Sequence, residues 1–284
     1  MTEEKAGREV DLLADKIESV PSLPRITSRV ISLVNKPETD AEDLSRAIRS
    51  DPALSARVLK FANSSYYGQA GKVTSIKRAV TVLGFNTVRS LALSYGVEEH
   101  YTAPECPDFP REEFWDYSLA VGVGGEIIAR RLGYDAERQD CVFSAGHLHA
   151  VGRAVIDQHL HRELIRIIQK VNREDLTMFQ AEKEVLDTTH CELGAAVLEH
   201  WNLPDILPRI ARHYYEPAGS DEELVTVVHL ASVLVKTKNI GFSGDDDISY
   251  LDEESVNRLN LADDAFETIL REELPREFER IKTD

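Results

Sequence analysis

The chain is poor in cysteine and has no long apolar run. Its 284 residues include only Cys106, Cys141 and Cys191, which are widely separated and form no C-x-x-C pair. This spacing indicates neither a disulfide framework nor a zinc ribbon, so we expect three reduced thiols. No apolar stretch approaches the ~18–20 residues of a membrane span, and the N-terminal residues contain no apolar signal core. These absences favour a cytoplasmic protein with no membrane partner.

Positive charge is also scarce. The formal net charge is −17, from 50 acidic and 33 basic side chains. Residues 1–100 are roughly neutral, whereas residues 221–284 carry about 17 acidic and about 7 basic side chains. Such a surface repels phosphate backbones, so we expect no nucleic-acid partner and interpret the acidic C-terminal region as solvated surface.

Strand patterns are nearly absent, and almost every segment has helical periodicity. Asp40, Asp51 and Ser75 precede such segments and can accept hydrogen bonds from the first backbone N–H groups of a helix. The pattern therefore predicts an all-α protein. We expect helices over residues 41–48, 52–62, 76–84, 86–93, 114–132, 138–149, 163–171, 177–186, 192–201, 224–236 and 263–280, and another that begins at Pro204.

Two segments fit more than one function. Residues 75–95 read as two helices joined by Gly84, an outline that also fits a DNA-reading helix-turn-helix. Arg89 is the only cation of the second helix, so we favour a packed helical hairpin. The glycine-rich run 122–125 lacks the spacing of a nucleotide-binding loop and follows no strand, so close packing between helices is the preferred explanation.

Several other side chains have structural interpretations. We expect Trp115 and Trp201 in the core, because each lies in an apolar helical stripe. The amide of Asn63 is expected to hold the backbone that follows its helix. Tyr66 and Tyr67 fit either burial between helices or an exposed aromatic surface.

Histidine is the most informative residue type in the chain. Positions two apart on a helix point to different faces, so at most one of His147 and His149 is expected to enter a given site. His149, His190 and His213 could together hold a divalent metal such as zinc or iron. The alternative is that each is a hydrogen-bonded core residue.

Several longer stretches resemble a known family. The likeness to the HDOD (HD-related output domain) family is carried by VPSLPRITSRVISLV, IRSDPALSARVLKFANSSYYG, SIKRAVTVLGFNTVRSLAL, FWDYSLAVGVGGEIIARRLG, SAGHLHAVGR and HCELGAAVLEHWNLP. It extends to about residue 235. The resemblance implies an N-terminal helical lobe (residues 1–100) packed on an HD-domain-like helical bundle (residues 101–240). Residues 241–284 lie outside the resemblance, and we expect them to form an acidic C-terminal helical extension.

The resemblance also implies a degenerate metal site. In HD phosphohydrolases a His, a His–Asp pair and a later Asp bind a metal, which activates water for attack on phosphorus. The matching positions in this chain are Tyr117, His149, Ala150 and Ser232. Three of the four have lost their ligand. The positions of His190 and His213 resemble further histidines of the HD-GYP branch, which hydrolyses cyclic di-GMP, but the GYP signature is absent.

Three functions are compatible with this resemblance. The first is a non-catalytic bacterial signalling protein that acts by binding a protein partner or a small molecule. The second is residual metal-dependent phosphodiesterase or phosphohydrolase activity on a nucleotide or cyclic dinucleotide. In the third, the degenerate metal site binds a nucleotide or a metal without turnover, and its occupancy shifts the angle between the two lobes. The sequence leaves the partner, the stimulus and the oligomeric state open.

Overall fold

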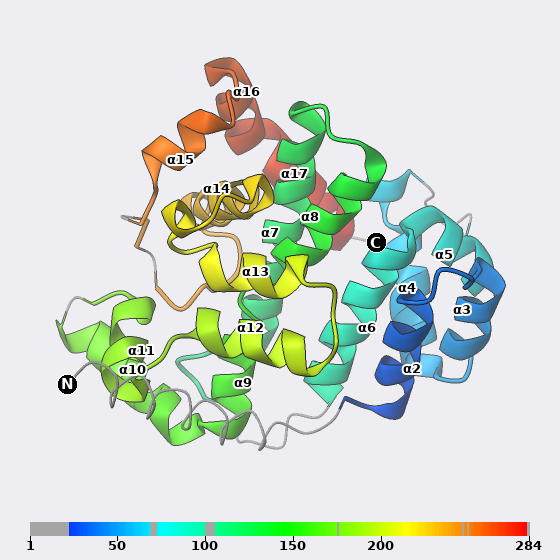
Figure 1. The fold of residues 1–284 in the computed structure, drawn as a ribbon, viewed down its shortest axis with the longest axis horizontal. Helices are drawn as coiled ribbons and strands as arrows, with labels where there is room; N and C mark the ends of the chain where they lie inside the picture. The colour runs from blue at the N-terminus through cyan, green and yellow to red at the C-terminus, as the bar shows by residue number, and fades with distance from the viewer. Residues whose placement is uncertain are drawn as a thin grey trace.

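The computed structural model describes residues 23–68, 73–99, 106–174, 176–245, 247–248 and 250–282. Throughout this part of the chain every regular element is a helix, which confirms the all-α prediction (Figure 1). No helix in it is both long enough and apolar enough to cross a membrane.

An N-terminal lobe lies at one side of the molecule, coloured blue to cyan in Figure 1. Its helices pack chiefly as the pairs α2–α6, α4–α5 and α3–α5. They are α2 (Arg25–Val34), α3 (Ala41–Ile48), α4 (Pro52–Asn63), the 3-10 turn η1 (Ser65–Tyr67), α5 (Ile76–Leu83) and α6 (Phe85–Glu99).

The polar residues expected at helix starts act as caps. Asp40 accepts hydrogen bonds from the backbone N–H groups of Glu42 and Asp43 and completes a capping box. Asp51 and Ser75 accept the corresponding bonds at the starts of α4 and α5. The amide of Asn63 bonds the backbone N–H and C=O of Val73, at 2.9 and 2.7 Å, and so holds the chain after α4 as expected.

Helix α6 resolves the helix-turn-helix question. It extends six residues beyond the expected end at Leu93, and its residues from Thr87 to Gly96 are all buried. A helix surrounded by protein on its faces cannot enter a DNA groove. Residues 75–95 therefore form a packed hairpin.

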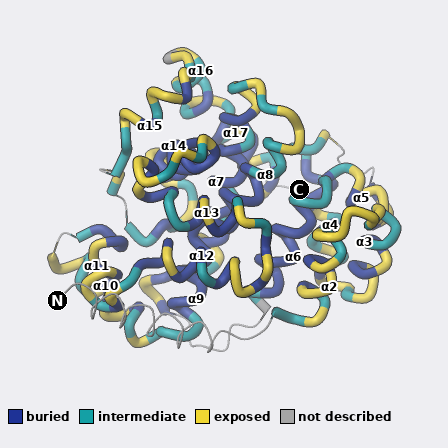
Figure 2. Tube along the Cα trace, viewed as in Figure 1, coloured by how far each residue is buried: buried dark blue, intermediate teal, exposed yellow. Residues whose placement is uncertain are grey.

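The HD-like lobe is built around α7, which packs against α8 and α14, while α12 packs against α9 and α13. Figure 2 shows its buried interior. Its elements are α7 (Arg111–Arg131), α8 (Ala136–Leu148), α9 (Val151–His159), α10 (His161–Glu174), α11 (Met178–Leu186), α12 (His190–His200), α13 (Ile206–His213), the 3-10 turn η2 (Pro217–Gly219) and α14 (Glu223–Thr237). Trp115 and Trp201 are buried, as expected.

One element of this lobe differs from the expectation. Helix α9 was not expected, because Ala150 precedes it without any side-chain cap and nothing in the sequence marks its start. The glycine-rich run behaves as expected: a Cβ on Gly122 would lie 2.8 Å from Phe143 O on α8. A contact of that length excludes any side chain, so Gly122 allows α7 and α8 to approach closely.

The C-terminal region consists of α15 (Glu253–Arg258), α16 (Asp263–Thr268), the π-helical segment η3 (Ile269–Glu273) and α17 (Leu274–Lys282). The single helix expected over residues 263–280 is thus interrupted by η3. Helix α17 contacts both α7 and η1, and Ser65 Oγ donates to Arg280 O at 3.2 Å. The largest apolar cluster runs from Val30 in α2 to Ile281 in α17, so one core joins the lobes and the extension.

Candidate functional site

The positions matched to HD metal ligands are buried, and three of them converge. Tyr117 lies on α7, His149 at the end of α8 and Ser232 on α14, and each is at most 1% exposed. The rings of Tyr117 and His149 lie 5.4 Å apart, edge to face. Ser232 Oγ is 2.9 Å from the hydroxyl of Tyr250, which also bonds the hydroxyl of Tyr117. Hydroxyl groups therefore occupy two of the places where carboxylate or imidazole would be needed.

His149 is held as a neutral core residue. Its Nδ1 lies 2.6 Å from Gly146 O, and because a carbonyl only accepts, Nδ1 carries the proton. The ring packs edge-on against Tyr214 at 4.5 Å. Burial lowers the pKa of the imidazole to about 3. The remaining nitrogen, Nε2, is buried and has no hydrogen-bond partner.

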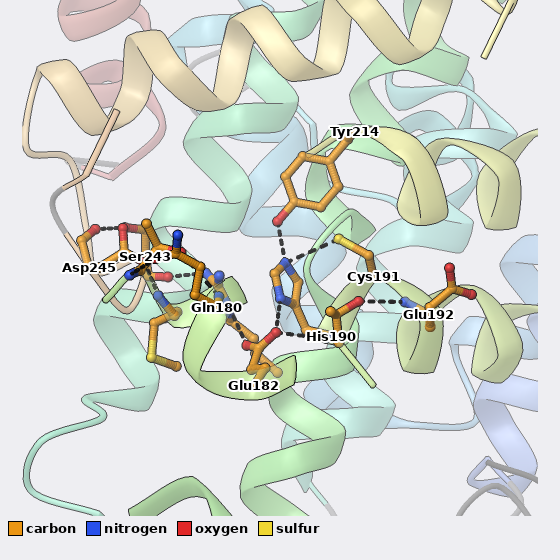
Figure 3. Close-up of polar contacts among 12 residues, drawn as sticks. Gln180, Glu182, His190, Cys191, Glu192, Tyr214, Ser243 and Asp245 are labelled. Carbon is orange, nitrogen blue, oxygen red and sulfur yellow. Dashed lines mark hydrogen bonds and ion pairs between the residues drawn. The ribbon is translucent and has the colours of Figure 1, made fainter. Parts of the chain in front are cut away.

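His190 forms the centre of a directed chain of hydrogen bonds, drawn in Figure 3. Its Nδ1 lies 2.5 Å from Glu182 Oε2, and its Nε2 lies 2.6 Å from the Tyr214 hydroxyl. Since a carboxylate only accepts, Nδ1–H donates to Glu182, and Tyr214 donates to Nε2. Burial lowers the pKa of the His190 imidazole, so the ring is neutral.

This carboxylate–imidazole–hydroxyl chain has the connectivity of a hydrolase triad but no access to a substrate. Glu182 and His190 are 0% exposed and Tyr214 is 1% exposed. Burial raises the pKa of the Tyr214 hydroxyl well above its usual value, so the oxygen stays protonated. A nucleophile must reach its substrate, and this hydroxyl is enclosed by protein.

A guanidinium lies in the same interior. Arg153 on α9 is 1% exposed; its Nε lies 3.4 Å from Glu182 Oε1, and it donates a further bond to the carbonyl of Ser243. Lys236 on α14 donates to Asp245 Oδ1 at 2.5 Å, and Asp245 Oδ2 accepts the Met178 N–H at 2.7 Å. The segment 243–245 is therefore tied to α9, α11 and α14.

The structure does not bring His213 to this interior. His213 ends α13, is half-buried and lines a surface cleft of about 580 Å³ with Arg209, Arg212 and Glu222. Its neighbour Tyr214 points inward instead, to His190. Over the described residues no three His, Cys, Asp or Glu side chains are arranged to hold a metal ion. The expected trio of His149, His190 and His213 thus does not assemble.

Comparison with known proteins identifies the family. The model of the HDOD domain matches residues 20–217. The chain belongs to the HDOD family. An uncharacterized protein of Treponema pallidum is 25% identical over 227 residues, which are 79% of this chain and 44% of that protein. Uncharacterized YuxH of Bacillus subtilis is 24% identical over 173 residues, 61% of this chain and 36% of YuxH. The chain therefore spans less than half the length of these curated relatives.

Solved structures share the HDOD fold. An HDOD domain protein of unknown function from Geobacter sulfurreducens superposes with a TM-score of 0.78, at 23% identity and 98% coverage of both chains. A Marinobacter aquaeolei protein, described provisionally as a signal transduction protein, superposes with a TM-score of 0.74 at 22% identity. That match covers 97% of this chain and 64% of the other. These identities establish the all-helical fold alone.

A divalent metal does not fit between Tyr117, His149 and Ser232, the positions matched to HD metal ligands. Ala150 and Ser232 offer no carboxylate, and burial raises the pKa of the Tyr117 phenol, which keeps it protonated. Both ring nitrogens of His190 are already bonded, which leaves His149 Nε2 as one free imidazole nitrogen. Metal sites in proteins normally need three or four such ligands, and the Arg153 guanidinium would repel the ion.

The residues that complete this interior carry no motif that marks them in the sequence. These residues are Arg153, Glu182, Lys236 and Asp245. A signal existed for Glu182: it lies four residues after Met178 and four before Leu186, in the buried stripe of α11. A carboxylate in such a stripe requires a partner in the core.

Proposed function

We propose that this HDOD protein is a non-catalytic regulatory component of bacterial signal transduction, located in the cytoplasm. It would act by binding a protein partner or a small molecule. The observation that carries the proposal is the sealed interior: Tyr117, His149 and Ser232 contact other protein groups instead of presenting ligands to a metal. The provisional description of the Marinobacter relative agrees with a signalling role.

Nucleic acid is not the expected partner. The helix that resembles a DNA-reading element is buried, and the net charge is −17. Long-range repulsion of phosphate backbones follows from that charge. A protein surface or a small ligand is more compatible with it.

Hydrolysis and metal content separate this proposal from a residual phosphohydrolase. Untagged protein should contain no stoichiometric zinc or iron, and it should hydrolyse neither nucleotides nor cyclic dinucleotides above a variant with His149, His190 and His213 all replaced by alanine. About one metal per chain that is lost in the variant, together with turnover, would contradict the non-catalytic role.

The regulatory role itself is tested in cells. Deletion of the gene should change the transcript levels of the bacterium. A folded His149→Gln variant should restore those levels as fully as the wild-type chain does. A folded variant that fails to restore them would indicate that the interior pocket, and not the outer surface, carries the function.

A further inference from the structure

The interior of the HD-like lobe contains its own cations. Arg153 follows Ala150 by three residues, so it projects from the first turn of α9, next to the position where the family pattern loses its aspartate. Its side chain is 2% exposed, and that of Glu182 is 0% exposed. An arginine in such a place is charged at every accessible pH.

The guanidinium is electrostatically close to the degenerate positions. Burial has the largest effect on the pKa of the Tyr117, His149 and Tyr250 side chains. The charge of Arg153 adds to this effect at His149 and opposes it at the two tyrosines. The same charge acts on His190 and Glu182. Arg153 therefore contacts Glu182 on α11 and lies within electrostatic reach of Tyr117, His149 and His190.

Buried charges in this interior balance. Arg153 and Lys236 carry two positive charges, and Glu182 and Asp245 carry two negative charges. Glu182 also accepts the His190 backbone N–H at 2.9 Å, and Asp245 accepts the backbone N–H of Met178. Such an arrangement satisfies carboxylates that would otherwise be costly to bury.

We propose that Arg153 provides, as a fixed part of the chain, the positive charge that a metal ion provides in HD enzymes. It is a positioning residue: it holds Glu182, which orients His190, and it anchors the segment 243–245 through Ser243 O. The inference concerns the organisation of the pocket and does not depend on the regulatory role proposed above.

A double-mutant cycle tests this assignment. Arg153→Met removes the charge at similar length and should lower the unfolding temperature by on the order of 10 °C, because it leaves a buried carboxylate without a cation. Adding Glu182→Gln removes that carboxylate, so the double variant should unfold at a higher temperature than Arg153→Met alone. Shifts that simply add would mean that Arg153 only fills space, and would overturn the proposal.

A matched control exists in the same chain. Arg57 and Glu98 form a two-pronged pair at 2.6 and 2.7 Å, but both side chains are about 30% exposed. Arg57→Met with Glu98→Gln should therefore show little coupling. Coupling as large as in the Arg153 cycle would show that burial is not the cause, which also contradicts the proposal.

Two further measurements keep the test decisive if Arg153→Met does not fold. Arg153→Lys retains the charge and should fold, whereas equal failure of the lysine variant would overturn the assignment. Nitrogen NMR of His190 should report a proton on Nδ1 in the wild type and in Arg153→Lys. Loss of that tautomer in Arg153→Lys would show that the charge does not position the ring.

Discussion

Burial fixes the charge of two histidines near the end of α8. His147 and His149 are at most 2% exposed, and burial lowers the pKa of each imidazole to about 3. His147 Nδ1 lies 2.9 Å from Ser90 Oγ, and His149 Nδ1 donates to Gly146 O. In the unfolded chain both would titrate near the usual value of about 6.5. Between about pH 3 and about pH 6.5, the folded protein therefore keeps both imidazole rings neutral, whereas the unfolded chain binds a proton at each.

The stability of the protein should consequently fall as the pH drops below about 6.5. Between that value and about pH 3 the unfolded chain binds one more proton at each of these histidines than the folded chain does. Each thus contributes a slope that approaches ~1.4 kcal/mol per pH unit. His147→Asn should remove one such contribution and flatten the profile. Urea unfolding at several pH values from about 7.5 to 5.5 measures this, and an equally steep profile in the variant would contradict it.

Prediction from the sequence succeeded at single residues where the cause is local. Asp40, Asp51 and Ser75 were recognisable as caps, because a cap bonds backbone groups two or three residues away. Arg153 and Glu182 are 29 residues apart and meet only after α9 and α11 have packed. Nothing in the spacing of such a pair along the chain fixes their distance in the fold.

Helices α9 and α12 meet at Gly152, where α9 has no room for a side chain. A Cβ on Gly152 would overlap His190 O and lie 2.7 Å from Gly194 N. The obstructing atoms are backbone, so they cannot rotate away. This contact fixes the position of α12, and therefore of His190, against the start of α9.

Gly152→Ala should therefore destabilise the protein by ~3 kcal/mol or more, although alanine normally favours a helix. Gly124→Ala is the matched control, because its nearest neighbour, Leu274 Cδ1, lies at an ordinary 3.4 Å. That variant should be neutral or slightly more stable. Thermal unfolding compares the two, and equal melting temperatures would refute the steric argument.

The expected helices agreed with the structure where periodicity was long and capped, and failed at α9 and in the C-terminal region. The start of α9 lacks a capping side chain, and the break within residues 263–280 is a π-helical segment that no residue pattern announces. The family resemblance implied that Tyr117, His149 and Ser232 belong to one site. It did not reveal that His213 points outward, since neighbouring residues on a helix such as α13 face in different directions.

At the scale of the whole molecule, α17 joins parts of the chain that are far apart in sequence. It packs on α7 of the HD-like lobe and on η1 of the N-terminal lobe. Leu274, Phe278 and Ile281 are buried there, and Arg280 donates to Ser65 O. The C-terminal extension thus contributes to the contact between the lobes, together with α6 and α8.

Phe278→Ala should weaken this junction by ~3 kcal/mol through loss of buried apolar contact. Hydrogen exchange should then increase together in α17 and in residues 65–68, while α12 remains protected. Arg271→Ala, at a side chain 71% exposed, should change neither. Faster exchange confined to α17 would show that the helix does not stabilise the N-terminal lobe.

The position of Arg153 also bears on how this chain could change during evolution. Groups that would have to be replaced to rebuild a metal centre lie on α7, α14 and the turn between α8 and α9, while the resident guanidinium lies on α9. A new aspartate at position 150 alone would add a third carboxylate to two cations, and loss of Arg153 alone would leave one too few. Each single step is opposed by the burial of an unpaired charge. Selection for folding therefore acts against both of these steps toward metal-dependent hydrolysis.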